Sequence, residues 1–271
     1  MNIFKRVFIW IRNLLIFFFV SSILAVVAYK FIPVYYTPLM FIRMFEQKME
    51  GKDLKLKHQW VPLSEIAQPL VQAVIASEDN LFLEHNGFDL EQIQKAREEA
   101  ERGKRVRGAS TISQQTAKNV FLWPAQSYVR KAVEVYFTLL IELIWGKERI
   151  MEVYLNSIEM GNGIYGAEAV ANLHFNKQAY QLTQSEAALI AATLPNPRRF
   201  NSAKPSAYIL KRQATIISLM GKMFQVDMGY KKGDGKVSTK KRKKWRASVL
   251  SIGEESIMEK DLSGRQLYLM L

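Results

Sequence analysis

Apolar residues recur with a helical period along most of the chain, and strand-like alternation is scarce. The pattern predicts helices over residues 69–77, 90–102, 130–144, 147–156, 182–194 and 208–220. It also predicts a helix that begins near residue 111. Residues 46–60 are charged and predict a loop with one short strand at most. A chain in which helical periods dominate is typical of a mainly α fold.

The N-terminal region has a different pattern. Leu14 to Tyr29 form an apolar run that is broken only by two serines. With Arg12 and Lys30 at its ends, the run reaches the ~20 residues that span a bilayer. Residues 1–32 therefore predict a membrane anchor whose short basic tail lies in the cytoplasm. A cleaved signal peptide is the alternative, because small residues lie near the end of the run, and either segment would export the rest.

Composition narrows the classes of protein. A chain of 271 residues that is 49% hydrophobic can bury one sizeable core, which we place at residues 33–222. The absence of cysteine excludes disulfides, thiolate metal sites and a cysteine nucleophile. Three histidines stand far apart, which argues against a histidine-ligated zinc site.

The net charge of +13 is concentrated near the C-terminus. Residues 231–246 hold nine Lys or Arg and one Asp, a local +8 that leaves +5 for the remainder. We therefore treat residues 223–271 as a basic tail whose order the sequence leaves open, and we expect no nucleic-acid partner.

The first candidate for chemistry is the carboxylate pair Glu78 and Asp79, at the C-terminal end of the helix predicted at 69–77. The negative end of a helix disfavours another carboxylate charge, and partial burial would raise a carboxyl pKa toward the range of a general base. The ordinary alternative is a solvated or helix-capping role.

A second candidate is the helix that begins near Thr111. Thr111 and Gln114 have the spacing of a capping box. Gln114, Gln115 and Lys118 share one helix face with Thr111, and a basic, glycine-containing loop precedes them. This arrangement suits an anion such as phosphate, although a capped helix with a polar face is common without any ligand.

Two further glutamates lie on predicted helices. Glu134 belongs to the polar stripe of the helix at 130–144, so it faces solvent or a cleft; the alternative is a pair with Lys131. Glu152 lies among apolar residues of the next helix, and we expect it to pair with a nearby Lys or Arg.

Four ordered motifs together resemble those of the family 51 glycosyltransferases, the peptidoglycan polymerases. They are Glu-Asp-x-x-Phe-x-x-His-x-Gly from Glu78, Gly-x-Ser-Thr-Ile-x-Gln-Gln-x-x-Lys-Asn from Gly108, Arg-Lys-x-x-Glu from Arg130 and Lys-x-x-Ile-x-Glu-x-Tyr-Leu-Asn from Lys147. The resemblance covers about Tyr35 to Met220 and is strongest to the monofunctional members of Gram-negative bacteria, which carry no transpeptidase domain. One position departs: many members have Arg, thought to help hold the substrate pyrophosphate, where this chain has Gln126.

The resemblance implies a lysozyme-like, two-lobed catalytic domain that dips into the membrane and joins lipid II to a lipid-linked glycan by an inverting β-1,4 transfer. Glu78 would take the proton of the acceptor hydroxyl. Glu134 would assist departure of the lipid pyrophosphate, directly or through a divalent ion such as Mg²⁺ or Mn²⁺, with no obligatory cofactor. The phosphates would be held by Ser110, Lys118 and Arg130. The residues expected to shape or line the cleft are Asp79, His85, Gln114, Gln115, Asn119, Lys131 and Glu152.

By the same resemblance, the protein is a single-pass component of the bacterial inner membrane with a periplasmic catalytic domain. Its partners would be lipid II, the lipid-linked chain and the membrane, with other cell-wall synthesis proteins left open. One alternative is a lytic enzyme that cleaves glycan strands, but a hydrolase has no use for cations such as Lys118 and Arg130. Another is an anchored interaction protein whose glutamates form surface ion pairs.

Overall fold

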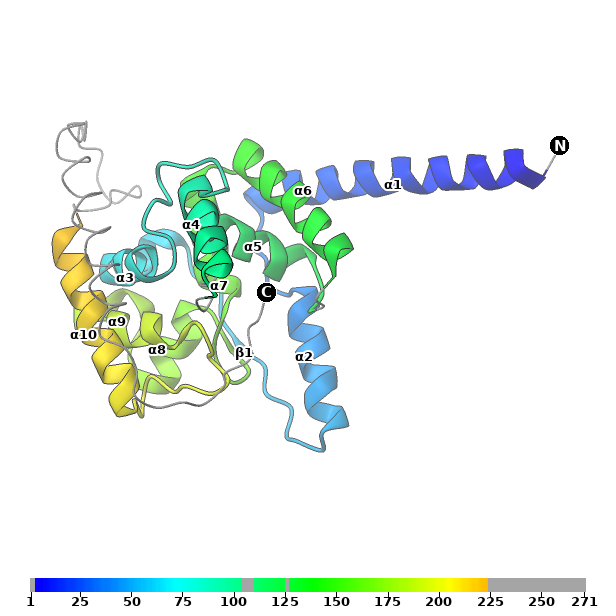
Figure 1. Ribbon diagram of the computed structural model, residues 1–271. Helices are drawn as coiled ribbons and strands as arrows, with labels where there is room; N and C mark the ends of the chain where they lie inside the picture. The colour runs from blue at the N-terminus through cyan, green and yellow to red at the C-terminus, as the bar shows by residue number, and fades with distance from the viewer. Residues whose placement is uncertain (1–2, 104–109, 125–126, 224–271) are drawn as a thin grey trace.

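The computed structural model describes residues 3–103, 110–124 and 127–223, which are mainly helical as predicted (Figure 1). The α-helices are α1 (Ile3–Phe31), α2 (Pro38–Met49), α3 (Gln68–Glu78), α4 (Leu90–Glu101), α5 (Ile112–Phe121), α6 (Tyr128–Ile144), α7 (Lys147–Ser157), α8 (Ala167–Phe175), α9 (Gln184–Thr193) and α10 (Ala207–Lys222). Short 3-10 turns lie at Leu63–Glu65 and Ala179–Gln181. The predicted basic tail lies, apart from Met223, outside the described residues.

A small sheet joins the loop after α2 to the turn after α7. Its strands are β1 (Lys57–His58), β2 (Glu159–Gly161) and β3 (Ile164–Tyr165), in the order β1-β3-β2. β1 runs parallel to β3, and β2 is antiparallel to it. The single strand expected before residue 60 is therefore β1, and the glycine-rich turn at 159–166 supplies the other two strands of the sheet.

Local signals account for several helix ends. α6 begins two residues before the expected position, because the Ser127 hydroxyl accepts a hydrogen bond from the Arg130 amide at 3.1 Å and caps the helix. α2 was not predicted as a helix. Its start is capped by Thr37 and carries Pro38 in the first turn, where the missing N–H of proline costs nothing.

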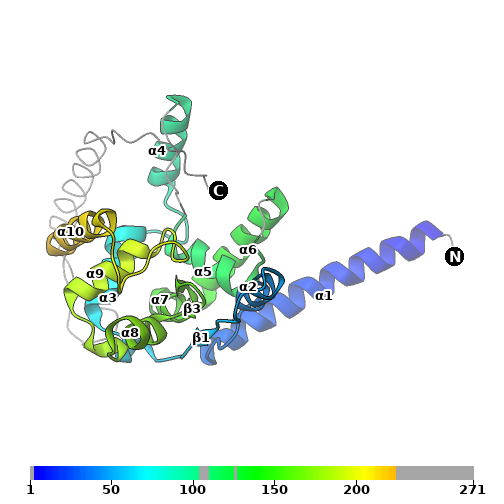
Figure 2. The same ribbon diagram turned by 90° about the horizontal axis from the view of Figure 1, so that it is seen from below.

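Two groups of helices enclose the core. α3, α9 and α10 pack together, while α5 packs against α6 and α7 (Figure 2). Phe82, Tyr154 and Ile112 are among the largest fully buried side chains. The C-terminal end of α3 thereby comes to lie beside α5 and α7, and this contact positions the Glu78 side chain.

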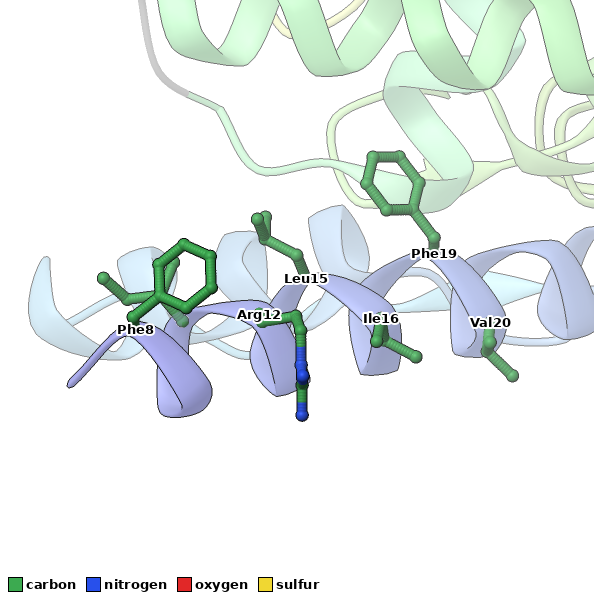
Figure 3. Close-up of a pocket in the computed structure, with 7 residues that line it drawn as sticks. Phe8, Arg12, Leu15, Ile16, Phe19 and Val20 are labelled. Atoms are coloured by element: carbon green, nitrogen blue, oxygen red, sulfur yellow. The ribbon is translucent and has the colours of Figure 1, made fainter. Parts of the chain in front are cut away.

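Helix α1 is 29 residues long, projects from the body of the molecule and is long and apolar enough to cross a membrane (Figure 1). A hollow of about 470 Å³ lies along its free half, lined by apolar side chains and Arg12 (Figure 3). The other half packs on α6: Val26 is fully buried, its carbonyl accepts a hydrogen bond from the Trp145 indole at 2.7 Å, and Ser22 shares a 2.8 Å hydrogen bond with Tyr136.

Arg149 of α7 binds the end of this helix. Its guanidinium donates to the Tyr29 carbonyl at 2.8 and 3.1 Å and also to the Ile32 carbonyl. The last carbonyls of a helix lack intrahelical donors and carry partial negative charge, so a cation satisfies both needs. The same guanidinium binds Glu152 of α7 at 2.9 Å, which fixes the side chain that holds the end of α1.

Arg149→Ala should loosen α1 from the domain because three charge-assisted hydrogen bonds to helix-terminal carbonyls are lost. The chain has no cysteine, so spin labels on single cysteines introduced at the exposed positions Lys30 and Leu143 report the distance between α1 and α6 without background. We expect a broader distance distribution in the variant. Arg97→Ala, which breaks an exposed ion pair on α4, is the control and should leave the distribution unchanged. Equal distributions in all three proteins would show that Arg149 does not hold the anchor.

Candidate active site

Glu78 is the last residue of α3, and its side chain is 13% exposed. One carboxylate oxygen accepts a hydrogen bond from the Gln115 side-chain amide at 3.2 Å, and the other lies 4.0 Å from the Arg212 guanidinium. Burial raises the pKa of Glu78; Gln115, Arg212 and Lys118 oppose this effect, whereas Asp79 adds to it. The carboxyl is therefore a stronger proton acceptor than an ordinary surface glutamate.

Asp79 is buried, and its carboxylate binds groups inside the protein. Its carboxylate oxygens lie 2.9 and 3.0 Å from Nε2 of His85, and one of them accepts the Ile112 backbone N–H at 2.9 Å. The Gly87 amide donates to Nδ1 of His85 at 3.1 Å, so Nε2 carries the proton and donates to Asp79. Asp79 thus fixes both the loop after α3 and the start of α5.

Gly87 is required where this loop meets α6. Its φ is +91°, and a Cβ there would lie 2.9 Å from the Thr138 methyl group. The Gly87 carbonyl also accepts the Thr111 hydroxyl at 2.7 Å. The glycine of the first motif is therefore explained by backbone conformation and close packing.

The capping box predicted at Thr111 is present. The Thr111 hydroxyl accepts the Gln114 amide N–H at 3.1 Å, and the Gln114 side-chain oxygen accepts the Thr111 N–H at 3.0 Å. Gln114 and Asn119 are buried, while Ser110 is exposed just before the helix. Of the predicted polar face, Thr111 and Gln114 close the cap, Gln115 donates a hydrogen bond to Glu78, and Lys118 acts on Glu78 through its charge.

Glu134 on α6 is 3% exposed, so it does not face open solvent. One oxygen accepts from Arg130 at 2.7 Å and the other from Lys131 at 2.6 Å. The predicted alternative, a pair with Lys131, is therefore present and is joined by Arg130. A carboxylate that accepts from two cationic donors holds those donors in place.

Lys118 interacts electrostatically with both Glu78 and Glu134. Part of its side chain is open to solvent, but the atoms crowded around its ammonium lower its pKa; Arg130 and Lys131 lower it further, and Glu134 and Glu78 raise it. Lys118 is thus within electrostatic reach of Glu78 on α3 and Glu134 on α6. Lys118 of α5 acts both on the charged groups of α6, the next helix in the sequence, and on Glu78 of α3, which lies far before it.

Comparison with known proteins agrees with this arrangement. The sequence profile of a family described as transglycosylase matches residues 46–221, most of the described domain. The chain belongs to the transglycosylase family. A protein of Bacteroides thetaiotaomicron named biosynthetic peptidoglycan transglycosylase is 61% identical over 240 residues, which cover 89% of this chain and 97% of that protein. Proteins of the same name from Bdellovibrio bacteriovorus and Caulobacter vibrioides are 51% and 52% identical, over 77% and 76% of this chain and 84% and 89% of theirs.

Membership of the transglycosylase family confirms the resemblance drawn from the four motifs, and it confirms the mainly helical, lysozyme-like fold. The matched residues lie inside the domain that we placed at 33–222. The boundaries of that domain stay a prediction.

Glu152 of this transglycosylase has a neighbour that the motifs did not specify. Glu152 pairs with Arg149 at 2.9 Å, as expected for a glutamate among apolar residues, and so lies next to the anchor contact. Gln126 and Gly108 lie outside the described residues, so the consequence of the missing arginine stays a prediction.

Sequence analysis missed Arg212 and the role of Tyr154. Arg212 comes from α10, which carries none of the four motifs, and no local signal marks it. Tyr154 belongs to the fourth motif, and this membership was the only sign in the sequence that it matters. It is fully buried, and its hydroxyl donates a hydrogen bond to Gln115 at 3.2 Å.

The donor set of this transglycosylase does not fit a resident divalent ion. Both oxygens of Glu134 already bind cationic side chains. Within the described ranges, no group of three or more His, Asp or Glu side chains could hold a metal. A divalent ion would have to arrive with the pyrophosphate, whose oxygens are its natural ligands.

Proposed function

We propose that this transglycosylase polymerises lipid II into β-1,4-linked glycan strands, with inversion at the donor anomeric carbon and release of undecaprenyl pyrophosphate. Peptidoglycan glycosyltransferase activity is what the family and the names of the relatives indicate. The observation that carries the residue roles is the position of Lys118, a cation on α5 whose charge acts both on Glu78, a carboxyl with a raised pKa, and on Arg130 and Glu134 of α6.

The chemistry needs a base at the acceptor and positive charge at the leaving group. Glu78 takes the proton of the acceptor 4-hydroxyl while that oxygen forms a bond to the donor anomeric carbon. The bond from this carbon to the pyrophosphate breaks, and the pyrophosphate leaves with the electron pair. Lys118 and Arg130 stabilise the charge that develops on it, and the resemblance adds the exposed Ser110 before α5 as a phosphate contact.

Glu134 assists this departure through its two partners. Because its oxygens bind Arg130 and Lys131 at 2.7 and 2.6 Å, it fixes where those cations stand before substrate arrives. Preorganised charges need no rearrangement during the reaction, which is the main source of electrostatic catalysis. The optional Mg²⁺ or Mn²⁺ stays a proposal that polymerisation with and without chelator would test.

Membrane attachment supports a lipid-linked substrate. We propose a single-pass inner-membrane protein with its basic N-terminal tail in the cytoplasm and its catalytic domain in the periplasm. The packing of α1 supports a retained anchor, because removing it would expose the contacts made by Ser22, Val26 and Arg149. Lipid II and the lipid-linked chain are then delivered from the same bilayer.

One assay separates the candidate activities. The full chain in detergent is incubated with labelled lipid II and, separately, with purified glycan strands. We expect polymer from lipid II and no cleavage of strands. Cleavage without polymer would favour the lytic alternative, and neither reaction would favour an anchored interaction protein.

A further inference from the structure

We infer that Tyr154 is a positioning residue for the base: its hydroxyl holds the side-chain amide of Gln115 in the orientation that points the amide N–H at Glu78. The inference rests on the proposed role of Glu78. It concerns a residue that is fully buried and therefore acts on the reaction through another side chain.

The contacts form one line across three helices. Tyr154 of α7 donates from its hydroxyl to Oε1 of Gln115 at 3.2 Å. Gln115 of α5 donates from Nε2 to Oε2 of Glu78 at 3.2 Å, at the end of α3. One amide thus has its acceptor end occupied by a phenol and its donor end occupied by a carboxylate.

These two connected hydrogen bonds control which protonation state of Glu78 is favoured. A protonated Glu78 would prefer the carbonyl end of the amide, and the amide could present it by turning over. In the wild-type protein that turn takes away the acceptor of the Tyr154 hydroxyl, and a buried donor without an acceptor is costly. Tyr154 therefore disfavours the turned amide and, with it, the protonated base.

The hydroxyl of Tyr154 remains a donor throughout the working range. Burial raises the pKa of the phenol well above its ordinary value, and the negative charges of Glu78 and Asp79 raise it further. The other charged groups that face Glu78 are Arg212 from α10, Lys118 from α5 and the adjacent Asp79. None of them contacts the Tyr154 hydroxyl in a hydrogen bond within the described residues, so removal of the hydroxyl leaves them in place.

The test is the pH dependence of the polymerisation rate in Tyr154→Phe. Without the hydroxyl the amide can turn at little cost, the pKa of Glu78 rises, and the base is lost at a higher pH than in the wild type. The acid limb of the profile should therefore move to higher pH, with about a two- to tenfold loss of rate on that limb, the equivalent of one ordinary hydrogen bond. The rate on the alkaline plateau should be retained.

Tyr165→Phe is the matched control. Tyr165 is also buried, but its hydroxyl has no hydrogen-bond partner among the described residues, and the carboxylate that most affects it is Glu159. This variant should keep the wild-type profile. The position of the acid limb does not depend on how much enzyme is folded, so a modest loss of stability in either variant does not mask the result.

A second variant tests whether Tyr154 acts through Gln115. Gln115→Met removes the amide and should move the acid limb in the same direction, and adding Tyr154→Phe to it should cause no further movement. An unmoved limb in Tyr154→Phe, or additive movements in the double variant, would overturn the inference. The proposed function fails separately, through an active Glu78→Gln protein.

Discussion

Glu78→Gln should abolish lipid II polymerisation while leaving lipid II binding largely intact. The substitution keeps the shape of the side chain and removes the proton acceptor. General-base catalysis typically supplies ~10² to 10⁴ in rate, so the loss of kcat should be at least of that order. Polymer formed from labelled lipid II measures the rate, and binding of labelled lipid II to the inactive protein measures retention.

Glu148→Gln is a suitable control, because Glu148 is an exposed glutamate in the first turn of α7. It should polymerise lipid II at the wild-type rate. If Glu78→Gln remained within a few-fold of wild type, Glu78 would not be the base, and the proton would have to leave by another route.

Lys118→Ala should slow turnover by about 10²- to 10³-fold, the loss typical of one preorganised group that stabilises developing negative charge. Lys118 lies near Arg130, Lys131 and Glu134, where the departing pyrophosphate is proposed to bind. Because the interaction strengthens as the leaving group gains charge, kcat should fall more than KM rises. Steady-state kinetics with lipid II separate the two effects.

Lys95→Ala, an exposed lysine on α4, is the control and should change neither constant. A lower melting temperature of Lys118→Ala with unchanged kinetics would make Lys118 a structural residue. The kinetic outcome and the stability outcome are measured separately. Both are open to Lys118, because its ammonium is crowded enough to have a lowered pKa while part of its side chain stays open to solvent.

The helices of this protein could be predicted because their signals are local. The capping box at Thr111 depends on a spacing of three residues and was found where the sequence indicated, and α6 formed over the residues whose helical period predicted it. Helix α2 was missed because its aromatic and proline-rich surroundings suit several environments, and the Thr37 cap is a weak signal by itself.

The site was less accessible to the sequence because its contacts are not local. A helical pattern places Glu134 on the polar side of α6 but does not show that this side is covered, and the residue is in fact buried with two cations. Arg212 reaches Glu78 only because α10 packs on α3. The motifs identified the residues that meet, whereas the direction of each hydrogen bond required the fold.

The hydrogen bonds from Arg149 to the end of α1 couple the orientation of the catalytic domain to that of the anchor helix. The backbone carbonyls of Val26, Tyr29 and Ile32 all accept hydrogen bonds from the catalytic domain. The anchor helix therefore does not rotate freely relative to that domain. A turn of α1 about the membrane normal therefore turns the whole domain with it. A membrane protein that bound the exposed half of α1 would therefore set the orientation of the catalytic domain in the plane of the membrane. That orientation determines the direction in which the glycan strand is extended.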